Sequence, residues 1–559
     1  MGFQLSLFLF LASLPGILAQ EVADARIVVM GATTVAETDD NFICATIDWW
    51  PHYKCNYNQC PWGYSSVINL DLSHPFLAKA IQAFNHLRIR IGGSLQDQVV
   101  YDVGSLKTPC HPFSKKADGL FGFSKGCLHM NRWDEINHLF NKTGAIVTFG
   151  LNALYGRHQI RKGVWGGDWD SSNALSFMKY TISKGFQIES WEFGNELSGS
   201  GVGASVSAEQ YGRDLINLKD IINELYKNSH SRPLLIAPGG FYDQEWYTKL
   251  LQASKDLLSN TSCNHLLLSG VDPNLVSKIL DPSYLSRVSE TFSNLEHTIQ
   301  KHGPWASAWV GESGGAYNSG GRLVSDTFVN SFWYLDQLGM ASKYSTKAYC
   351  RQTLIGGNYG LLNTTTLHPN PDYYRQEHLN LFSNAVFIRE LSEKLFALLW
   401  HRLMGKGVLA VHSNISSYLR AYAHCSKGRA GVTLLVINLS NQTEFGITVQ
   451  NSMNMNLRVE EKTTQREQSF VHGLKKTVSW IGRKASDETT SREEYHLTPK
   501  DGYLRSQTMV LNGTPLQLTE DGDIPALDPV LVDVNSPISV APLSIAFVSF
   551  PNFEATACV

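Results

Sequence analysis

The chain has 559 residues, 43% of them hydrophobic, and this length suits two domains with large cores better than one. Its 47 basic and 50 acidic residues give a formal net charge of −3, which argues against a nucleic-acid-binding protein and offers no strong attraction to polyanions. Aromatic residues make up 11% of the chain, a share that suits both sugar-stacking clefts and ordinary cores.

The first twenty residues predict a signal peptide. They hold an apolar run at 5–11, a break at Pro15-Gly16 and the small Ala19 near a cleavage point, although no Lys or Arg precedes the run. A loose myristoylation pattern, MGFQLS, is the less favoured interpretation. No later stretch reaches the roughly 18 unbroken apolar residues of a membrane span. We expect a secreted protein of the extracellular space or cell wall, or one delivered to a vacuole or lysosome-like compartment.

Cysteines and glycosylation motifs agree with an oxidising compartment. The nine cysteines lack zinc-site spacing, so disulfides are the better interpretation, with at least one cysteine left over. Cys55 with Cys60 and Cys110 with Cys127 are candidate local pairs on proximity. No metal or organic cofactor is expected. Predicted N-glycosylation sites are Asn141, Asn260, Asn363, Asn414, Asn438, Asn441 and Asn512.

Residues 40–385 alternate between short apolar runs and amphipathic helical patterns such as 208–227. Eight such runs separated by helices are typical of a (β/α)₈ TIM barrel, so the predicted fold class is α/β. The predicted strands are 42–48, 87–93, 145–151, 188–196, 233–240, 263–268, 306–312 and 347–354.

From about residue 386 to 559 the pattern changes to short β runs with turn signals between them. This texture predicts a C-terminal all-β sandwich domain. An isolated apolar run at 26–30 precedes the barrel, and we expect it to join the sandwich as a strand.

Two short runs, WEFGNE and WVGES, each end in glycine followed by an exposed glutamate. They place Glu196 and Glu312, 116 residues apart, at the ends of predicted strands four and seven. Carboxylates at the carboxyl ends of barrel strands meet at the active-site face, and a pair of them is what glycosidic-bond hydrolysis requires. Glu192 competes for the acid role, but it lies deeper along its strand. Ordinary surface ion pairs are the alternative for these glutamates.

The motifs TIDWWP, LRIRIGGS, SWEFGNE, WVGESGGAYNSGG and RQTLIGGNYG, spread over nearly the whole chain, resemble the heparanase-like family of retaining glycoside hydrolases, and within it the plant β-glucuronidase branch. The resemblance implies that Glu196 is the acid/base and Glu312 the nucleophile. It also implies a disulfide between Cys425 and Cys558. It further implies that Asp48 and Ser94 contact the sugar, and that Gly357 and Tyr359 belong to a loop whose backbone amides hold the uronate carboxylate. Asn195, beside the acid, is a candidate to hold the sugar 2-hydroxyl.

One stretch departs from the family pattern. Family members usually carry a His-His-x-Tyr type motif at strand six, whereas LLSNTSCNHLLLSGVDPN has His265 and no tyrosine. Either this strand is built differently, or the chain is a weakened enzyme. Three functions remain. The first is a secreted β-glucuronidase acting on glucuronic-acid-containing glycans, such as wall proteoglycans. The second is a catalytically weak carbohydrate-binding or cell-wall protein. The third is a related barrel glycosidase that acts on a neutral sugar. Endo or exo action, peripheral membrane association and the oligomeric state are left open.

Overall fold

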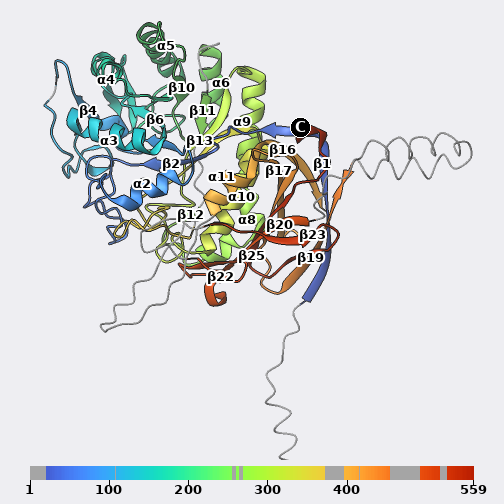
Figure 1. Cartoon of the computed structure of the whole chain (residues 1–559). Helices are drawn as coiled ribbons and strands as arrows, with labels where there is room; N and C mark the ends of the chain where they lie inside the picture. The colour runs from blue at the N-terminus through green and yellow to red at the C-terminus, as the bar shows by residue number, and fades with distance from the viewer. Residues whose placement is uncertain are drawn as a thin grey trace, which may run out of the picture.

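The computed structural model describes residues 21–107, 109–254, 260–263, 268–371, 396–413, 416–452, 491–516 and 526–558. Figure 1 shows a helix-covered barrel on one side and a large curved sheet on the other. The predicted signal peptide and the predicted domain boundary near residue 385 lie outside these ranges. No helix within them is long and apolar enough to cross a membrane.

Eight parallel strands close into a barrel in chain order, which confirms the predicted fold class. Most side chains of these strands are buried, as expected where helices cover the outside and side chains fill the inside. The strands are β2 (Ile43–Ile47), β3 (Arg88–Ile91), β6 (Ile146–Leu151), β9 (Ser190–Phe193), β10 (Leu234–Ala237), β11 (Asn260–Cys263), β13 (Ser307–Ser313) and β15 (Thr346–Arg351).

The sixth strand lies earlier than the apolar pattern predicted. The run CNHLLL suggested a strand at 263–268, but β11 is the preceding NTSC, which pairs with β10 and β13. Backbone pairing decides a strand inside a closed barrel, so a polar tetrapeptide can fill the position. His265 and the rest of 264–267 lie outside the described residues.

Helices follow the barrel strands, and local capping signals mark several of their ends. Ser207 accepts a hydrogen bond from the Gln210 amide at the start of α5, and Asp243 accepts one from the Trp246 amide at the start of α6. The helices are α2 (Pro75–Gln82), α3 (Met130–Thr143), α4 (Ser172–Ser183), α5 (Ala208–Leu225), α6 (Gln244–Ala253), α7 (Leu275–Ile279), α8 (Pro282–Leu285), α9 (Val288–His302), α10 (Val329–Lys343) and α11 (Phe396–Leu403).

Short pairs of strands decorate the loops between barrel strands. They are β4 (Val99–Asp102) with β5 (Gly126–His129), β7 (His158–Arg161) with β8 (Val164–Gly166), and β12 (Leu268–Ser269) with β14 (Ala316–Tyr317). Single turns of 3-10 helix occur at Gln96–Gln98, Leu120–Gly122, Lys500–Gly502 and Thr556–Cys558.

The second region is one continuous sheet of eleven strands. The N-terminal strand β1 lies inside it, antiparallel to β16 and parallel to β19. The strands are β1 (Glu21–Glu37), β16 (Met404–Ser413), β17 (Leu419–Ser426), β18 (Val432–Asn438), β19 (Thr443–Asn451), β20 (Ser491–Pro499), β21 (Met509–Leu511), β22 (Thr514–Pro515), β23 (Val530–Asp533), β24 (Ile538–Val540) and β25 (Ser544–Phe550).

This sheet folds over itself and also packs against the barrel. In β18, Leu434 and Val436 point into a core shared with Ile27 and Ile447, so strands distant in the sheet enclose one interior. The alternate residue Leu435 points the other way, into the core that continues through the barrel. Both faces of β18 are therefore buried, which explains its unbroken apolar sequence.

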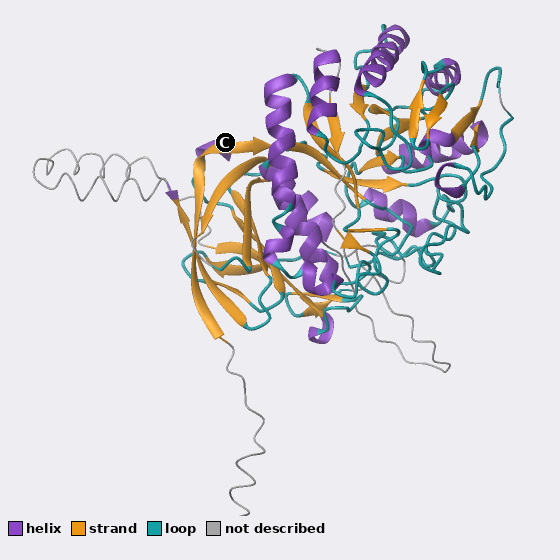
Figure 2. Ribbon diagram, turned by 180° about the vertical axis from the view of Figure 1, so that it is seen from behind, coloured by secondary structure: helices purple, strands orange, loops and turns teal. Residues whose placement is uncertain are grey.

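Helix α10 lies at the boundary between barrel and sheet, near α11 (Figure 1), and Figure 2 shows helices along this boundary from behind. Val329 to Ser342 are all buried. A helix that is buried all round must have packing partners on every side, and here the barrel and the sheet supply them.

Four disulfides occur among the described residues. Cys425 pairs with Cys558, Cys55 with Cys60, and Cys110 with Cys127. The fourth, Cys44–Cys350, was not foreseen; it joins β2 to β15, where the first and last barrel strands meet. The side chain of the ninth cysteine, Cys263, is outside the described part of the chain.

The predicted glycosylation sites differ in accessibility. Asn141 and Asn441 are exposed. Asn438 is fully buried and its Nδ2 donates to the Val540 and Ala541 carbonyls, so the structure argues against a glycan there. The Asn512 amide is hydrogen-bonded to Glu494 and Asp528 carbonyls, and Asn260 lies in β11, paired on both sides. Asn363 is half-buried, and Asn414 lies outside the described residues.

Candidate active site

Glu196 and Glu312 line the same cavity of about 310 Å³ at the barrel mouth. Glu196 follows the end of β9, and Glu312 lies at the end of β13. The lining also contains aromatic side chains suited to stacking on a sugar ring. Its described members are Trp50, Lys54, Asn56, Trp62, Ser94, Phe121, Glu196, Val202, Phe241, Glu312, Tyr317, Asn318, Ser319, Gln352 and Tyr359.

The turn that presents Glu196 has an unusual backbone. Glu196 has φ 52°, in the left-handed region that glutamate rarely occupies, at a cost of about 1–3 kcal/mol. The turn also needs Gly194 at φ 74°, because a Cβ there would come within 2.5 Å of the Leu197 side chain. Two hydrogen bonds from Asp97 hold the turn: its Oδ2 accepts from the Asn195 amide at 2.7 Å and its Oδ1 from the Ala153 amide at 2.7 Å.

Arg90 is the hub of the site. It is 1% exposed and donates from Nε to Glu192 Oε2 at 2.7 Å, from Nη1 to Glu312 Oε2 at 3.1 Å, and from Nη2 to Asn195 Oδ1 at 2.7 Å. Glycine at position 92 leaves room for the guanidinium, since a Cβ there would lie 2.8 Å from Cζ. Glu192 is thus a buried ion-pair partner below the cavity rather than a lining residue.

Burial and neighbouring charges shift the pKa values of Glu312 and Asp48. Burial raises the pKa of Glu312, and the Arg90 guanidinium opposes that rise. Burial and the charge of Glu312 raise the pKa of Asp48 well above its usual range. Because Glu312 bonds directly to a cation while Asp48 accepts from the neutral Gln352 amide, the neutral form is favoured more strongly at Asp48 than at Glu312.

The predicted sugar-contacting residues divide into two groups. Ser94 and Tyr359 line the cavity, whereas Asp48, Asn195 and Gly357 are not among its lining residues. Asp48 requires Gly93, where a Cβ would lie 1.9 Å from its Oδ1. Gly357 has φ 66°, and a Cβ there would come within 2.8 Å of the Tyr359 ring. The glycines of the IGGS and GGNYG motifs therefore clear space for neighbouring polar side chains.

Several site residues escaped prediction. Arg90, Asp97, Gln352 and Lys54 were not singled out. Arg90 had a usable signal: LRIRI alternates arginine with apolar residues in a strand expected to be buried, and buried arginines need anions. Arg88, on the same face, pairs with Glu189 at 2.6 Å. Asp97 and Gln352 carried no comparable local signal.

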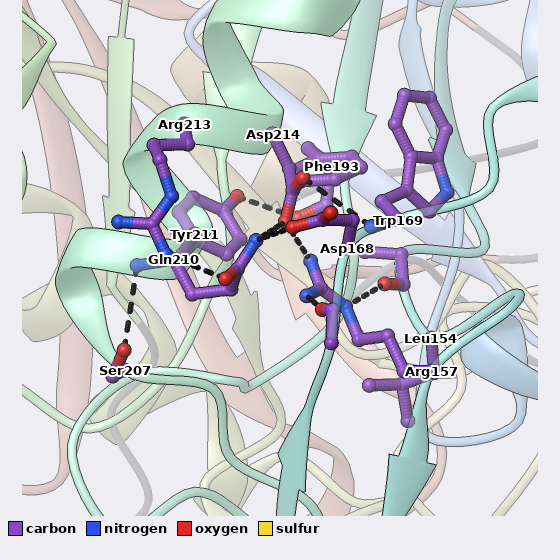
Figure 3. A network of polar contacts seen from close by, with 12 residues as sticks. Leu154, Arg157, Asp168, Trp169, Phe193, Ser207, Gln210, Tyr211, Arg213 and Asp214 are labelled. Carbon is purple, nitrogen blue, oxygen red and sulfur yellow. Dashed lines mark hydrogen bonds and ion pairs between the residues drawn. The ribbon is translucent and has the colours of Figure 1, made fainter.

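A second polar network joins the segment around the β7–β8 hairpin to α5 (Figure 3). Arg157 donates to Asp214 Oδ2 at 2.5 Å and to the Gly167 carbonyl at 2.5 Å, and Gln210 also donates to Asp214 Oδ2, at 2.9 Å. Arg157 and Gly167 bracket the β7–β8 hairpin, and Asp214 belongs to α5. The network therefore fastens the hairpin to the helix that follows the Glu196 turn.

One other cluster among the described residues has metal-type ligands: Asp102, Cys110 and Cys127. Its two sulfur atoms form a disulfide, so they offer no thiolate. This cluster does not fit a metal ion.

The chain is similar to known proteins in sequence and in fold. Residues 24–339 match the model of "Glycosyl hydrolase family 79, N-terminal domain". The chain is 63% identical to Heparanase-like protein 1 of Arabidopsis thaliana, covering 97% of this chain and 96% of the relative. It is 38% identical to baicalin-beta-D-glucuronidase of Scutellaria baicalensis, covering 96% and 94%. A GH51 arabinofuranosidase from Xanthomonas axonopodis pv. citri shares the fold, with TM-score 0.59, 12% identity, and coverage of 94% of this chain and 99% of that one.

Proposed function

The chain belongs to glycosyl hydrolase family 79 and is a glycoside hydrolase, and from that premise we propose that it is a secreted retaining β-glucuronidase. The observation that carries the proposal is the asymmetry of the two glutamates on one cavity. Glu312 bonds to Arg90, which favours its ionised form. Glu196 stands on a separate turn held by Asp97 through Asn195.

Each glutamate takes one role in this mechanism. Glu196 donates its proton to the glycosidic oxygen while Glu312 attacks the anomeric carbon, so the bond to the leaving group breaks and a covalent glucuronyl-enzyme forms. Glu196, now a carboxylate, deprotonates a water that displaces Glu312. The sugar leaves with its configuration retained and both glutamates return to their starting protonation states.

Substitution of the two glutamates tests these roles. Glu312→Gln is expected to lose on the order of 10⁴-fold or more in kcat on every glucuronide. Glu196→Gln should lose much less on an aryl glucuronide with a good leaving group than on one with a poor leaving group, because a good leaving group needs little protonation. Proton NMR should show the β anomer as the first product of a β-glucuronide, and the α anomer would exclude retention.

Glucuronide specificity is supported by the 38% identical relative named baicalin-beta-D-glucuronidase. Plausible natural substrates are glucuronic-acid-containing glycans, including wall proteoglycans. A panel of aryl β-glycosides compares the glucuronide with neutral sugars. Equal rates on glucoside and glucuronide would indicate a related glycosidase of neutral sugars.

Secretion is supported by the N-terminal sequence and by the disulfides. Expression of the full chain in a eukaryotic host, with N-terminal sequencing of protein from the medium, is expected to give a mature chain that begins near residue 20. Retention of Met1 in an intracellular product would contradict export.

A catalytically weak carbohydrate-binding protein is the second candidate, favoured by the absence of tyrosine from the sequence of the strand-six stretch 257–270. In that case the unsubstituted protein binds glucuronides in calorimetry without turnover. Measurable hydrolysis that disappears in Glu312→Gln excludes this candidate.

A further inference from the structure

Two apolar side chains line the catalytic cavity from the loop that carries Glu196 and from the loop next to it. Val202 lies in the loop after β9, and Phe241 lies in the loop after β10, the strand that pairs with β9. Phe241 is 47% exposed although it lines a cavity. Its ring is therefore open to a ligand that enters the cavity, and covering this apolar surface would favour binding.

Hydrogen bonds and close packing tie both loops to the Glu196 turn. The Val202 amide donates to the Glu196 carbonyl at 3.1 Å, and the Ser198 hydroxyl donates to the Phe241 carbonyl at 3.3 Å. A Cβ at Gly240 would lie 2.3 Å from Ser198 Oγ and 3.4 Å from Glu196 Cα, so a residue without Cβ is needed for this approach. Backbone contacts thus set the position of Phe241 relative to Glu196.

The lining differs between two neighbouring pairs of barrel strands. The segments after β9 and β10 contribute Val202 and Phe241 beside Glu196, and neither segment adds a cation to the described lining. The segments after β13 and β15 contribute hydroxyl and amide side chains, which can bond to sugar hydroxyls. These side chains are Tyr317, Asn318, Ser319, Gln352 and Tyr359.

The proposed mechanism places the leaving group beside Glu196. Glu312 attacks the anomeric carbon, and Glu196 protonates the oxygen that joins the sugar to its leaving group. That oxygen must come within about 2.6–3.2 Å of the Glu196 carboxyl. The leaving group therefore begins next to Glu196, where Val202 and Phe241 provide apolar surface.

We propose that Phe241 is a specificity-determining residue that stacks against the leaving group, and that this group is an uncharged sugar or a flat aromatic aglycone. The inference rests on the proposed function, because it uses the roles of Glu196 and Glu312. An uncharged partner loses less hydration than an anion when it covers an aromatic ring, and a flat one covers more of the ring face.

The test compares leaving groups on one sugar. In Phe241→Ala, kcat/KM on 2-naphthyl β-glucuronide should fall by about 10-fold, the size of one lost aromatic contact, while kcat/KM on β-glucuronyl fluoride stays within about twofold. Fluoride is a single atom and is too small to contact Phe241. Phe241→Trp should keep the naphthyl activity. Tyr418→Ala, which removes a 44% exposed ring of the second region that is not in the cavity lining, is the matched control and should change neither rate.

A disaccharide of glucuronic acid and a neutral hexose separates the two kinds of leaving group. A loss in Phe241→Ala on this disaccharide supports a sugar as the partner, and a loss on the naphthyl substrate supports an aromatic aglycone. A loss on neither overturns the inference. The inference is also overturned if the parent enzyme prefers a sulfated hexose to the neutral one as leaving group.

The remaining outcomes separate this inference from the proposed function. If the parent enzyme hydrolyses glucuronides and Phe241→Ala loses equally on the naphthyl substrate and the fluoride, the inference is overturned and the proposed function survives. Phe241 then supports the Glu196 turn instead of the leaving group. A selective loss in Tyr317→Ala but not in Phe241→Ala also overturns the inference, since the leaving group then lies against the segment after β13.

If the unsubstituted protein hydrolyses no glucuronide, the proposed function fails and binding replaces turnover as the readout. In calorimetry, 2-naphthyl β-glucuronide should then bind the unsubstituted protein about 10-fold more tightly than methyl β-glucuronide does. This advantage should disappear in Phe241→Ala. An advantage that persists in the variant overturns the inference.

Discussion

Arg90 at the cavity and Arg420 between barrel and sheet, one buried and one partly buried, show how the same ion-pair chemistry serves different ends. Arg420 of β17 forms two bonds to Asp336 of α10, at 2.7 and 3.2 Å, and its remaining donors reach Ser286 and Tyr422. Tyr422 also donates to Asp336, at 2.6 Å. One cation meets one anion here, and neither faces the catalytic cavity.

Arg90 has more than one carboxyl group around its single positive charge. Its partners include two glutamates, with the buried Asp48 also within electrostatic reach. Carboxyl groups outnumber the cation, so some of them must hold protons, and one of them, Glu312, opens onto the cavity. The Arg420–Asp336 pair, with equal numbers of charges and no contact with the cavity, joins two parts of the fold. The Arg90 cluster, with more carboxyl groups than cations and one of them at the cavity, provides groups whose protonation can change during a reaction.

The largest expected effect comes from removing the cation at the cavity. Arg90→Met is expected to lower kcat/KM by about 10³-fold, or about 4 kcal/mol, because Glu312 loses the charge that favours its ionised form. The acidic limb of the pH–rate profile should move to higher pH, since the pKa of Glu312 rises further. Arg88→Met, on the same strand, serves as control: it should reduce stability without moving that limb. If the acidic limb does not move in Arg90→Met, Arg90 does not favour the ionised form of Glu312.

At the closed pair the expected effect is on stability. Asp336→Asn removes a fully buried carboxylate and leaves the partly buried Arg420 guanidinium without its counter-ion, so the free energy of unfolding should fall by about 3 kcal/mol. Urea denaturation measures this change, while kcat/KM of the folded variant should match the parent enzyme. If activity falls as it does in Arg90→Met, the two clusters are not functionally distinct.

A smaller effect is expected at Asp97, which supports the Glu196 turn. In Asp97→Asn one of the two backbone amides faces an amide NH₂ instead of an oxygen, so kcat should fall about 30-fold, about 2 kcal/mol, with KM nearly constant. Asp97→Glu, which keeps a carboxylate, should retain more activity than Asp97→Asn. A rise in KM without a change in kcat would place Asp97 in substrate binding instead.

Asp97 also predicts a pH dependence of stability. Burial raises its pKa from 3.8 to about 7, so the folded chain holds this proton more tightly than the unfolded chain does. Its contribution to stability is therefore complete below pH 4 and is lost as the pH rises to about 7. The unfolding free energy of the parent, measured relative to Asp97→Asn, should decrease across that window. A constant difference would show that the Asp97 pKa is not raised.

The boundary between barrel and sheet should show a pH dependence of stability with the opposite sign. His424 is fully buried, bonded to the Gly405 carbonyl and to Ser342, and burial lowers its pKa to about 4. Between pH 6.5 and 4 only the unfolded chain gains the proton, so stability should fall with pH by at most about 1.4 kcal/mol per unit from this group. Chemical denaturation at several pH values should show that the stability of His424→Gln changes less steeply with pH than that of the parent. An identical pH dependence would show that His424 does not cause it.

The barrel and the position of the two glutamates could be predicted because both depend on patterns of neighbouring residues. Alternating apolar runs and helical segments predict the barrel, and glutamates placed after WEFGN and WVG predict a pair at one end of it. The apolar pattern gave a wrong position for strand six. The strand was predicted at the apolar HLLL, but the polar NTSC forms it. It also missed the Cys44–Cys350 disulfide, whose partners are 306 residues apart.

The sequence by itself determined the fold class, the family and the two glutamates, because periodicity and short motifs are properties of neighbouring residues. Only the tertiary structure decided that Arg90 bonds to Glu192, 102 residues away, and to Glu312, 222 residues away. Barrel closure likewise places Lys54 at the same cavity and Asp97 beneath the Glu196 turn. The charge of each group at this site depends on burial and on partners from other strands, and no local pattern of residues contains that information.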